Sequence, residues 1–378
     1  MKIAVMMRAI DQPSAWQAFI EGLIEKMLQI DNENNYLLMY KTDKWYGRFR
    51  SYKNAKEVLI TAPNKFFWDQ VSVPLEARKE KIDVIWNPKF SVPLISHCPV
   101  AMGLAEMGWR IWPEYYEKLD VLYQKLLFRI YCRKSRHFFP WSQFQRDEIG
   151  RYLGKTLDNA TVTPPAVKEI FRPIDDRSVL ETFRETKKLP RNFILGVTRV
   201  DHPGVQGSTS FFPGKNVDTT VKAFIQCRDR IPHGLVIAGR RVKEYLLYRG
   251  FSESDFKGVH FLGFVPHDEL PKLFNLAQLF VMPSFFEGFG LTLLEAMACG
   301  CPAVVSETGA CSEVGGDAVL TADPNDPADF AEKIISVLED EAKLQDLRQK
   351  SLDRAAFFNW ERSARLTIEG LKKAAGKL

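Results

Sequence analysis

The chain has no hydrophobic run of about 18 residues, the length that a membrane-spanning helix needs. Its first residues, MKIAVMMRAIDQPSAW, place one lysine before a short apolar run and then turn polar. They lack the apolar length and the small-residue cleavage site of a secretory signal peptide. The sequence therefore predicts a cytoplasmic protein that does not span a membrane, and it leaves peripheral attachment to the inner face of a membrane open.

Cysteine and histidine are scarce, with six of each among 378 residues. So few cysteines in a chain of this size indicate reduced thiols rather than a disulfide framework. Cys299, Cys301 and Cys311 lie close in sequence, but ligands separated by one residue with no histidine nearby make a poor zinc pattern. We interpret these three as small core residues and expect neither a metal nor a cofactor.

A dense basic stripe is missing too, since the formal net charge is only +5. Residues 1–185 hold 28 Lys and Arg against 23 Asp and Glu, and the rest of the chain holds 24 of each sign. This excess is too weak for a nucleic-acid-binding protein, but it suits an acidic acceptor or an anionic membrane surface. An ordinary solvated surface is the alternative.

Hydrophobic residues make up 46% of the chain and charged residues 26%, which is typical of a globular protein long enough for two domains. In the N-terminal half, short apolar runs alternate with a segment of helical periodicity. This pattern predicts a mostly parallel sheet of Rossmann type. The expected strands are KIAVMM, YLLMY, EVLIT, DVIWN and CPVAMGL, and the expected first helix is WQAFIEGLIEKMLQI.

Residues 164–192 contain proline and charge without a strong period, and we interpret them as an interdomain linker. A second series follows, with the expected strands FILGVT, GLVIAG, VHFLGF, LFVMP and CPAVVS and the expected helices VDTTVKAFIQCR, DELPKLFNLA and LTLLEAMAC. The fold class is therefore α/β, with two doubly wound domains facing a central cleft. Ligands of such sheets collect outside the carboxyl ends of the strands, so the chemistry is expected there.

The most informative segment is 282–306, MPSFFEGFGLTLLEAMACGCPAVVS. An apolar strand ends at Pro283, a turn with two glycines follows, and a good helix former runs from Leu291 to about Cys299. The glycines let backbone N–H groups approach a ligand, and the helix start adds unpaired donors and the positive end of a dipole. This combination suits a diphosphate.

Two carboxylates, Glu287 and Glu295, bracket this turn. On a continuous helix they would lie on one face about 12 Å apart, which is comparable to a pyrophosphate with a sugar on each end. One carboxylate could then hold a transferred sugar and the other a ribose. The alternative is that Glu287 caps the helix and Glu295 is a solvated helical residue, and the pair taken alone favours this alternative.

The run EGFGLTLLEAMACGCPAVVS resembles the signature of the retaining glycosyltransferases of family 4, a large group with the two-Rossmann GT-B fold. Further matches occur in order: PRNFILGVTR, GKNVDTTVKAF, HFLGFVPHDELPKLFNLAQLFVMPS, SEVGGDAVLTADPNDP and FNWERSARL. The resemblance is dense in the C-terminal half and loose in the N-terminal half. It implies an acceptor-binding domain at 1–170, a nucleotide-sugar-binding domain at 190–355, and a terminal helix, about 358–378, that returns to the first domain.

The resemblance also implies residue roles. Glu287 would contact the transferred sugar, and Glu295 the donor ribose. Arg199 and Lys215 match the basic pair that neutralises the diphosphate and would stabilise the charge developing as the glycosidic bond breaks, although either could be an ordinary surface charge. The other implied donor-binding positions are Gly263, Phe264 and Val265 at the nucleobase, with Phe264 equally suited to a core, and Gly288, Phe289, Gly290, Leu291 and Thr292 at the sugar and phosphates.

By the same resemblance, the expected reaction is retaining transfer of a hexose from a GDP- or UDP-sugar to a glycan or lipid-linked acceptor, without a metal. The product would belong to a cell-surface polysaccharide or glycoconjugate. The leaving diphosphate itself could take the acceptor proton. The alternatives are an epimerase or phosphorylase of the same fold, and a non-catalytic partner that binds a nucleotide sugar.

The N-terminal half departs from the family pattern in two places. The loop after the first strand contains Gln12 and Trp16 where the family has a glycine-containing loop. The His-Asp pair that the family often places near the reacting carbon falls on Ala105 and Glu106. Glu106 is therefore a candidate for orienting the acceptor, with an ordinary loop carboxylate as the alternative.

Two further stretches carry open alternatives. Residues 202–214 separate the two basic residues of the implied pair by more than the family usually allows, and they predict either a mobile lid over the donor or an inert insertion. Residues 109–141 combine many aromatics with seven Lys and Arg against three Asp and Glu. This stretch could rest on a bilayer, or its aromatics could be core and its basic residues solvated helix faces.

Overall fold

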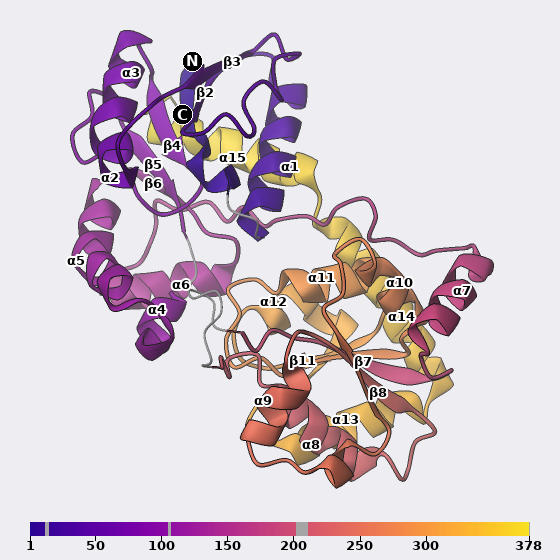
Figure 1. The fold of residues 1–378 in the computed structure, drawn as a ribbon. Coiled ribbons are helices and arrows are strands. Elements are labelled where there is room, and N and C mark those ends of the chain that lie inside the picture. The colour runs from indigo at the N-terminus through magenta and orange to yellow at the C-terminus, as the bar shows by residue number, and fades with distance from the viewer. Residues whose placement is uncertain (12–14, 105–106, 202–210, 378) are drawn as a thin grey trace. The chain divides into compact units, whose positions relative to one another are not determined.

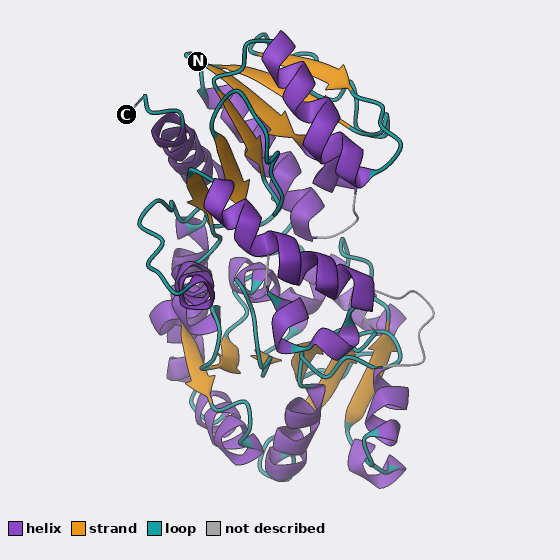
Figure 2. Ribbon diagram, turned by 90° about the vertical axis from the view of Figure 1, so that its left-hand side faces the viewer, coloured by secondary structure: helices purple, strands orange, loops and turns teal. Residues whose placement is uncertain are grey.

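The chain forms two compact units in a computed structural model, which describes residues 1–11, 15–104, 107–201 and 211–377. Unit 1 consists of Met1–Ile111, Lys118–Ala166 and Phe358–Leu378, and unit 2 of Trp112–Glu117 and Val167–Phe357. Each unit contains one six-stranded sheet with helices on its faces (Figures 1 and 2). None of the described helices is both long enough and apolar enough to cross a membrane.

The sheet of unit 1 is parallel throughout, in the order β3-β2-β1-β4-β5-β6. Its inner strands are apolar and almost fully buried, as expected for a parallel sheet covered on both faces. The strand order reverses between β1 and β4, and open α/β sheets ordinarily bind their ligands at the carboxyl ends of the strands at such a point. The strands are β1 (Lys2–Met6), β2 (Asn35–Tyr40), β3 (Ala55–Leu59), β4 (Val84–Asn87), β5 (Val100–Gly103) and β6 (His137–Phe139).

Crossover helices connect the strands of unit 1, and the last helix of the chain also belongs to this unit. Short turns of other helix types, η1 (Met7–Asp11) and η2 (Trp68–Ser72), follow β1 and α2. The helices are α1 (Ala15–Ile30), α2 (Lys65–Phe67), α3 (Val73–Lys79), α4 (Gly108–Ile111), α5 (Lys118–Lys134), α6 (Gln143–Leu153) and α15 (Trp360–Ala374).

The sheet of unit 2 is also parallel, in the order β12-β11-β10-β7-β8-β9. Counted from its first strand, this order is identical to that of unit 1, and the reversal lies between β7 and β10. The strands are β7 (Phe193–Val197), β8 (Gly234–Ala238), β9 (Val259–Gly263), β10 (Leu279–Met282), β11 (Ala303–Ser306) and β12 (Val319–Ala322).

The helices of unit 2 pack their apolar sides on this sheet around a core of aliphatic and aromatic side chains. Three 3-10 turns lie among them: η3 (Pro113–Tyr115), η4 (Glu253–Phe256) and η5 (Gly316–Ala318). The helices are α7 (Arg177–Lys187), α8 (Val217–Cys227), α9 (Val242–Tyr248), α10 (Leu270–Leu276), α11 (Leu291–Ala298), α12 (Cys311–Gly315), α13 (Pro327–Leu338) and α14 (Glu341–Phe357).

All ten strands that the sequence predicts are present, and two edge strands were missed. Strand β6 contains only three residues, and the two middle residues of β12 are half-buried. The prediction of an aperiodic linker over 164–192 is wrong, because this stretch contains α7. Leu180 and Phe183 of α7 are buried, and the helix begins where Asp176 accepts a hydrogen bond from the Ser178 amide at 2.9 Å.

The last helix, α15, lies in unit 1, where both chain ends are also found (Figure 1). Two glycines permit its close packing. A Cβ added at Gly22 of α1 would lie 2.6 Å from the Trp360 ring, and one added at Gly370 would lie 2.5 Å from the Phe139 ring. Glycine therefore occupies both positions for steric reasons.

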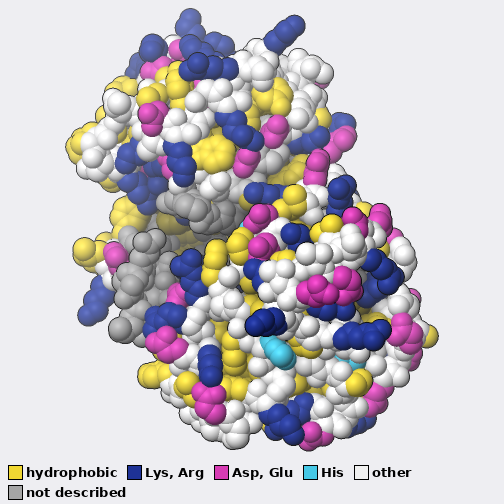
Figure 3. Space-filling view, turned by 45° about the vertical axis from the view of Figure 1, so that its right-hand side comes forward, with side chains coloured by type: hydrophobic (Ala, Val, Ile, Leu, Met, Phe, Trp, Pro, Cys, Tyr) yellow, Lys and Arg dark blue, Asp and Glu magenta, His cyan; other side chains and the backbone are white. Residues whose placement is uncertain are grey.

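Several aromatic residues of the stretch 109–141 are core residues, as one of the two interpretations expected. Aromatic residues of this stretch such as Trp109, Phe128 and Tyr131 are buried in the core of unit 1. Segment Trp112–Glu117 instead belongs to unit 2, where the Trp112 ring lies 5.3 Å from Phe212. On the face drawn in Figure 3, Lys and Arg side chains intermix with Asp and Glu.

Candidate functional site

The predicted donor-binding residues of unit 2 come together at the carboxyl ends of its strands. Arg199 follows β7 and is exposed. Lys215 adjoins Asn216, the N-cap of α8, and Glu287 follows β10. Strands β7 and β10 flank the point at which the strand order reverses. The residues therefore lie where an open α/β sheet ordinarily binds its ligand.

Lys215 and Glu287 form an ion pair, with Lys215 Nζ 2.5 Å from Glu287 Oε1. The Glu287 carboxylate is buried, with 8% of its side chain exposed, whereas the Lys215 side chain is 36% exposed. A carboxylate in this environment needs a cationic partner, because burial of an unpaired charge is costly. The interpretation of Lys215 as a bare surface charge is therefore wrong.

Asn216 holds Lys215 against the loop after β10. The Asn216 side-chain amide donates to the carbonyls of Pro283 at 2.9 Å and Pro324 at 2.7 Å. On the other side of Lys215, the Phe285 amide donates to the Gly214 carbonyl at 3.1 Å. Asn216 was not predicted as a site residue, and its left-handed backbone (φ 52°) is common for asparagine.

Gly309 lets a second loop approach the Glu287 peptide. It has a φ of +77°, and a Cβ at this position would lie 2.9 Å from Glu287 N and 3.0 Å from Glu287 O. The neighbouring Ala310 amide donates to the Glu287 carbonyl at 3.0 Å. Gly309 was not predicted as a site residue, because its contact joins segments that are distant in sequence.

Helix α11 begins at Leu291, after Gly290 in a left-handed conformation (φ +90°). Glu287 therefore precedes the helix, and the 12 Å separation derived from a continuous helix does not apply. The turn residues Gly288, Phe289 and Gly290 are buried, while Leu291 and Thr292 are half-buried at the helix start. The first amides of α11 point away from the helix body and are available to an anion.

Glu295 is buried in α11, so its interpretation as a solvated helical residue is wrong. Its Oε1 accepts a hydrogen bond from His267 Nε2 at 2.8 Å. The His267 ring in turn packs against Phe171 at 5.0 Å. His267 was missed from the sequence, although it follows the predicted nucleobase turn by only two residues.

The predicted nucleobase turn follows β9. Gly263 has a φ of +67°, and its carbonyl accepts a hydrogen bond from the Gly239 amide at 2.8 Å. Phe264 is 60% exposed, so the alternative that it belongs to the core is wrong. The Arg240 guanidinium lies 4.4 Å from the centre of its ring, and Val265 continues the turn.

Two buried hydroxyls at this edge of the sheet have no hydrogen-bond partner among the described residues. Thr198 Oγ1 lies just after β7, and Ser284 Oγ lies just after β10. Buried polar atoms are nearly always paired in folded proteins, either within the protein or with water or a ligand. The two hydroxyls are therefore consistent with a polar molecule at the β7 and β10 strand ends.

Several predicted residues lie outside the described part of the chain: Gln12, Ala105, Glu106 and most of 202–214. The role of Glu106 stays a prediction. Trp16 is described, and its ring packs 4.1 Å from Trp141. Within the described ranges, no group of three His, Cys, Asp or Glu side chains is placed to hold a metal, and Cys299, Cys301 and Cys311 are buried free thiols.

Comparison with known proteins agrees with this geometry. Residues 208–354 match the family model of glycosyl transferases group 1. O-antigen chain mannosyltransferase B of Escherichia coli is 30% identical over 93% of this chain and 88% of that protein. The serotype-specific mannosyltransferase WbdA of E. coli is 29% identical over 62% of this chain and 28% of its own length. The crystal structure of Anabaena HepE with UDP has a TM-score of 0.71 at 17% identity, covering 98% of this chain and all of that one.

The two parallel sheets and their structural neighbours define the GT-B fold. The chain belongs to the glycosyl transferases group 1 family. This assignment confirms the predicted fold class and enzyme class, and it favours a transferase over the epimerase, phosphorylase and non-catalytic alternatives.

Proposed function

We propose that the protein transfers a mannosyl residue, with retention of configuration, from a GDP- or UDP-sugar to a glycan or lipid-linked acceptor. The product would belong to a cell-surface polysaccharide such as an O-antigen, because a relative of this chain is the O-antigen chain mannosyltransferase B of E. coli. The observation that carries the proposal is the Lys215–Glu287 pair beside the start of α11, at the strand reversal of unit 2.

The negative charge of the donor diphosphate suits the positive groups of this site. The amides at the start of α11 and the side chains of Arg199 and Lys215 would face the diphosphate. The negative charge of a leaving diphosphate grows as the glycosidic bond breaks, so these groups stabilise the transition state more than the ground state. This stabilisation needs no metal, and the departing phosphate oxygen can accept the proton of the acceptor hydroxyl.

The two buried glutamates would hold the two sugars of the donor. Glu287 accepts hydrogen bonds from hydroxyls of the transferred sugar, while Lys215 keeps the carboxylate charged and oriented. Glu295 accepts hydrogen bonds from the donor ribose. The hydrogen bond from His267 Nε2 to Glu295 Oε1, at 2.8 Å, fixes the orientation of this carboxylate. The backbone of Gly263, Phe264 and Val265 would border the nucleobase.

Calorimetry and turnover together test this function. GDP-mannose, UDP-mannose and UDP-glucose are titrated into the full chain, and release of nucleoside diphosphate is followed with each donor. We expect one mannosyl donor to bind and turn over, and Glu287→Ala to reduce turnover by about 100-fold or more. Absence of affinity for all three compounds, or full turnover in Glu287→Ala, contradicts the proposal.

Unit 1 also carries a surface suited to peripheral membrane contact. Leu119, Leu122, Leu126 and Ile130 of α5 are between 43% and 79% exposed and share one face of the helix. Basic residues of the same helix (Lys118, Lys125, Arg129 and Arg133) would face anionic headgroups. We expect Leu122→Asp with Leu126→Asp to abolish sedimentation with anionic vesicles, and Val179→Asp with Leu247→Asp on unit 2 to leave it unchanged.

A further inference from the structure

A cavity of unit 2 lies at the amino edge of its sheet, away from the proposed donor site. Its volume is about 350 Å³, which is within the range of small-molecule pockets. Its walls come from α7, α10, α14 and the end of α11 (Figure 1). Gln278 precedes β10 and Gly300 precedes β11, whereas Glu287 follows the carboxyl end of β10. The start of α11 thus belongs to the proposed donor site and its end to this cavity, so the two sites are separate.

Hydrogen bonds hold the polar wall of the cavity in place. The Asn275 side chain accepts a hydrogen bond from the Ile174 amide at 2.8 Å and donates one to the Arg172 carbonyl at 3.0 Å. Gln278 Oε1 accepts a hydrogen bond from the Phe193 amide at 2.6 Å. These two polar side chains are engaged within the protein, which leaves the recognition of a ligand to the charged residues of the lining.

Positive charge predominates in the lining of the cavity. Its charged residues are Arg177, Arg184, Arg348 and Glu181. Unit 2 as a whole has the opposite balance, with 23 Lys and Arg against 29 Asp and Glu. Glu181 pairs with Arg184, whose Nη1 lies 3.1 Å from Glu181 Oε2. Arg177 and Arg348 form no ion pair with any residue that the structure describes, so two positive charges of the lining are uncompensated.

Two of the arginines also have buried donors without an acceptor. Arg184 Nε and Arg348 Nε are buried, and neither has a hydrogen-bond partner within the described part of the chain. Buried polar atoms are nearly always paired, either within the protein or with water or a ligand. Water supplies an acceptor oxygen but does not balance the positive charge of the lining. An anion does both.

The neighbouring thiols do not supply the missing negative charge. Cys299 lines the cavity, and burial raises the pKa of its thiol well above the usual range. Burial also raises the pKa of the Cys301 thiol to about 12, although the positive charge of Arg348 lowers it. Both thiols are therefore neutral near pH 7, and neither compensates Arg348.

Apolar side chains form the rest of the wall. Leu180 of α7 and Leu276 of α10 are buried, and Ile174 and Leu352 are half-buried. Apolar walls with a small number of charged groups are typical of sites for organic molecules. The cavity therefore suits an anion that carries an organic body.

We propose that this cavity binds a small soluble phosphate ester through Arg177, Arg184 and Arg348. The two uncompensated charges match the charge of a phosphate monoester, about −1.5 to −2 near pH 7, better than the single charge of a carboxylate. The planar guanidinium groups of arginine match phosphate oxygens and form charge-assisted hydrogen bonds with them. The site goes beyond the proposed function and does not depend on it, because it shares no residue with the proposed donor site.

Calorimetric titration with phenyl phosphate tests the site, in parallel with two comparison compounds. Benzoate carries a carboxylate in place of the phosphate, and inorganic phosphate lacks the organic body. The full chain carries Arg199→Met and Lys215→Met, so that the proposed donor site does not contribute. We expect phenyl phosphate to bind one site, at least tenfold more tightly than benzoate and at least threefold more tightly than inorganic phosphate. Absent binding of phenyl phosphate, or equal affinity for either comparison compound, overturns the proposal.

Substitutions in the lining locate the site. In this background, Arg177→Met with Arg348→Met removes the two uncompensated cations and should weaken phenyl phosphate binding at least tenfold. Arg177→Met alone, at an exposed residue, should weaken it at least threefold, and thermal melting verifies the fold of each protein. Glu181→Gln removes the carboxylate of the lining and should strengthen binding at least twofold, an effect that damage to the fold does not produce. Unchanged affinity in the arginine variants, or affinity that does not rise in Glu181→Gln, overturns the proposal.

The matched control replaces two exposed cations that also lie at the amino edge of the sheet but do not line the cavity, Arg191→Met and Lys257→Met. We expect this pair to leave the phenyl phosphate affinity within twofold. A loss equal to that of the Arg177 and Arg348 pair would place the binding outside the cavity and overturn the proposal. Failure of the proposed function is separate, because it would appear as absent binding of nucleotide sugars to the unmodified chain.

Discussion

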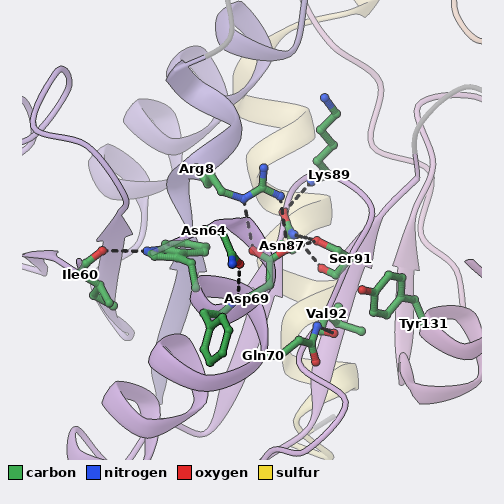
Figure 4. Close-up of polar contacts among 12 residues, drawn as sticks. Arg8, Ile60, Asn64, Asp69, Gln70, Asn87, Lys89, Ser91, Val92 and Tyr131 are labelled. Atoms are coloured by element: carbon green, nitrogen blue, oxygen red, sulfur yellow. Dashed lines mark hydrogen bonds and ion pairs between the residues drawn. The ribbon is translucent and has the colours of Figure 1, made fainter. Parts of the chain in front are cut away.

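The two sheets of this enzyme share one strand order but differ in what surrounds the reversal point. In unit 1 the buried Asp69 holds Arg8 (Figure 4), and in unit 2 the buried Glu287 holds Lys215. Unit 1 has an excess of 11 positive charges, and unit 2 an excess of six negative charges. The same strand order therefore carries different charged side chains at its reversal point in the two units.

The two buried carboxylates also differ in how they are used. Asp69 accepts hydrogen bonds from two side chains and has no exposed surface, whereas Glu287 has one cationic partner and retains some exposure. Asp69 therefore serves mainly to position Arg8 and Ser91. Glu287 precedes the start of α11, where the proposed donor would meet its carboxylate.

Replacing Asp69 gives the largest expected effect and tests this difference. Asp69→Ala leaves the part-buried Arg8 without its partner, and removing one member of a buried pair costs about 3–5 kcal/mol. Urea denaturation should therefore show a markedly lower free energy of unfolding. Glu287→Ala should cost much less stability, and an equal loss in the two variants would contradict the assigned roles.

The glycine beside Glu287 gives the next largest effect. Gly309→Ala would displace the Glu287 peptide, and a displacement of about 1 Å can reduce turnover by about 100-fold. Gly250→Ala is the matched control, because Gly250 also has a positive φ (+91°) but nothing lies within 4 Å of an added Cβ. Donor turnover should fall in Gly309→Ala and be retained in Gly250→Ala. An equal fall of turnover in both variants would mean that backbone strain alone causes the loss.

His267 gives the smallest expected effect, because its role is to orient Glu295. His267→Ala removes one hydrogen bond worth about 1 kcal/mol, which corresponds to about fivefold weaker donor binding. His267→Gln keeps a side-chain donor and should recover part of the affinity. Turnover at saturating donor should change little. A loss of turnover with unchanged donor affinity would contradict a positioning role.

Much of the fold was predictable because parallel strands are buried on both faces and form short continuous apolar runs. Most of the ten predicted strands have this signal, whereas β6 contains only three residues and β12 is half-buried at its two middle residues. Helix α7 was missed although its apolar residues Val179, Leu180 and Phe183 have helical spacing.

The donor-site residues were predictable through family resemblance rather than through spacing. The continuous-helix geometry for Glu287 and Glu295 was wrong, because Gly290 interrupts it with a left-handed conformation. His267, Asn216 and Gly309 were missed since each acts through a contact distant in sequence.

Nucleotide affinity is the most direct test of the comparison between the two units. GDP-mannose or UDP-mannose, whichever binds the unmodified enzyme, is titrated by calorimetry into the Arg199→Met, Lys215→Met pair of unit 2 and into the Lys65→Met, Lys89→Met pair of unit 1. The account predicts that nucleotide-sugar affinity falls by about 100-fold in the first pair, which removes two charge-assisted contacts, and stays unchanged in the second. Unchanged affinity in the first pair, or an equal loss in both, would contradict it.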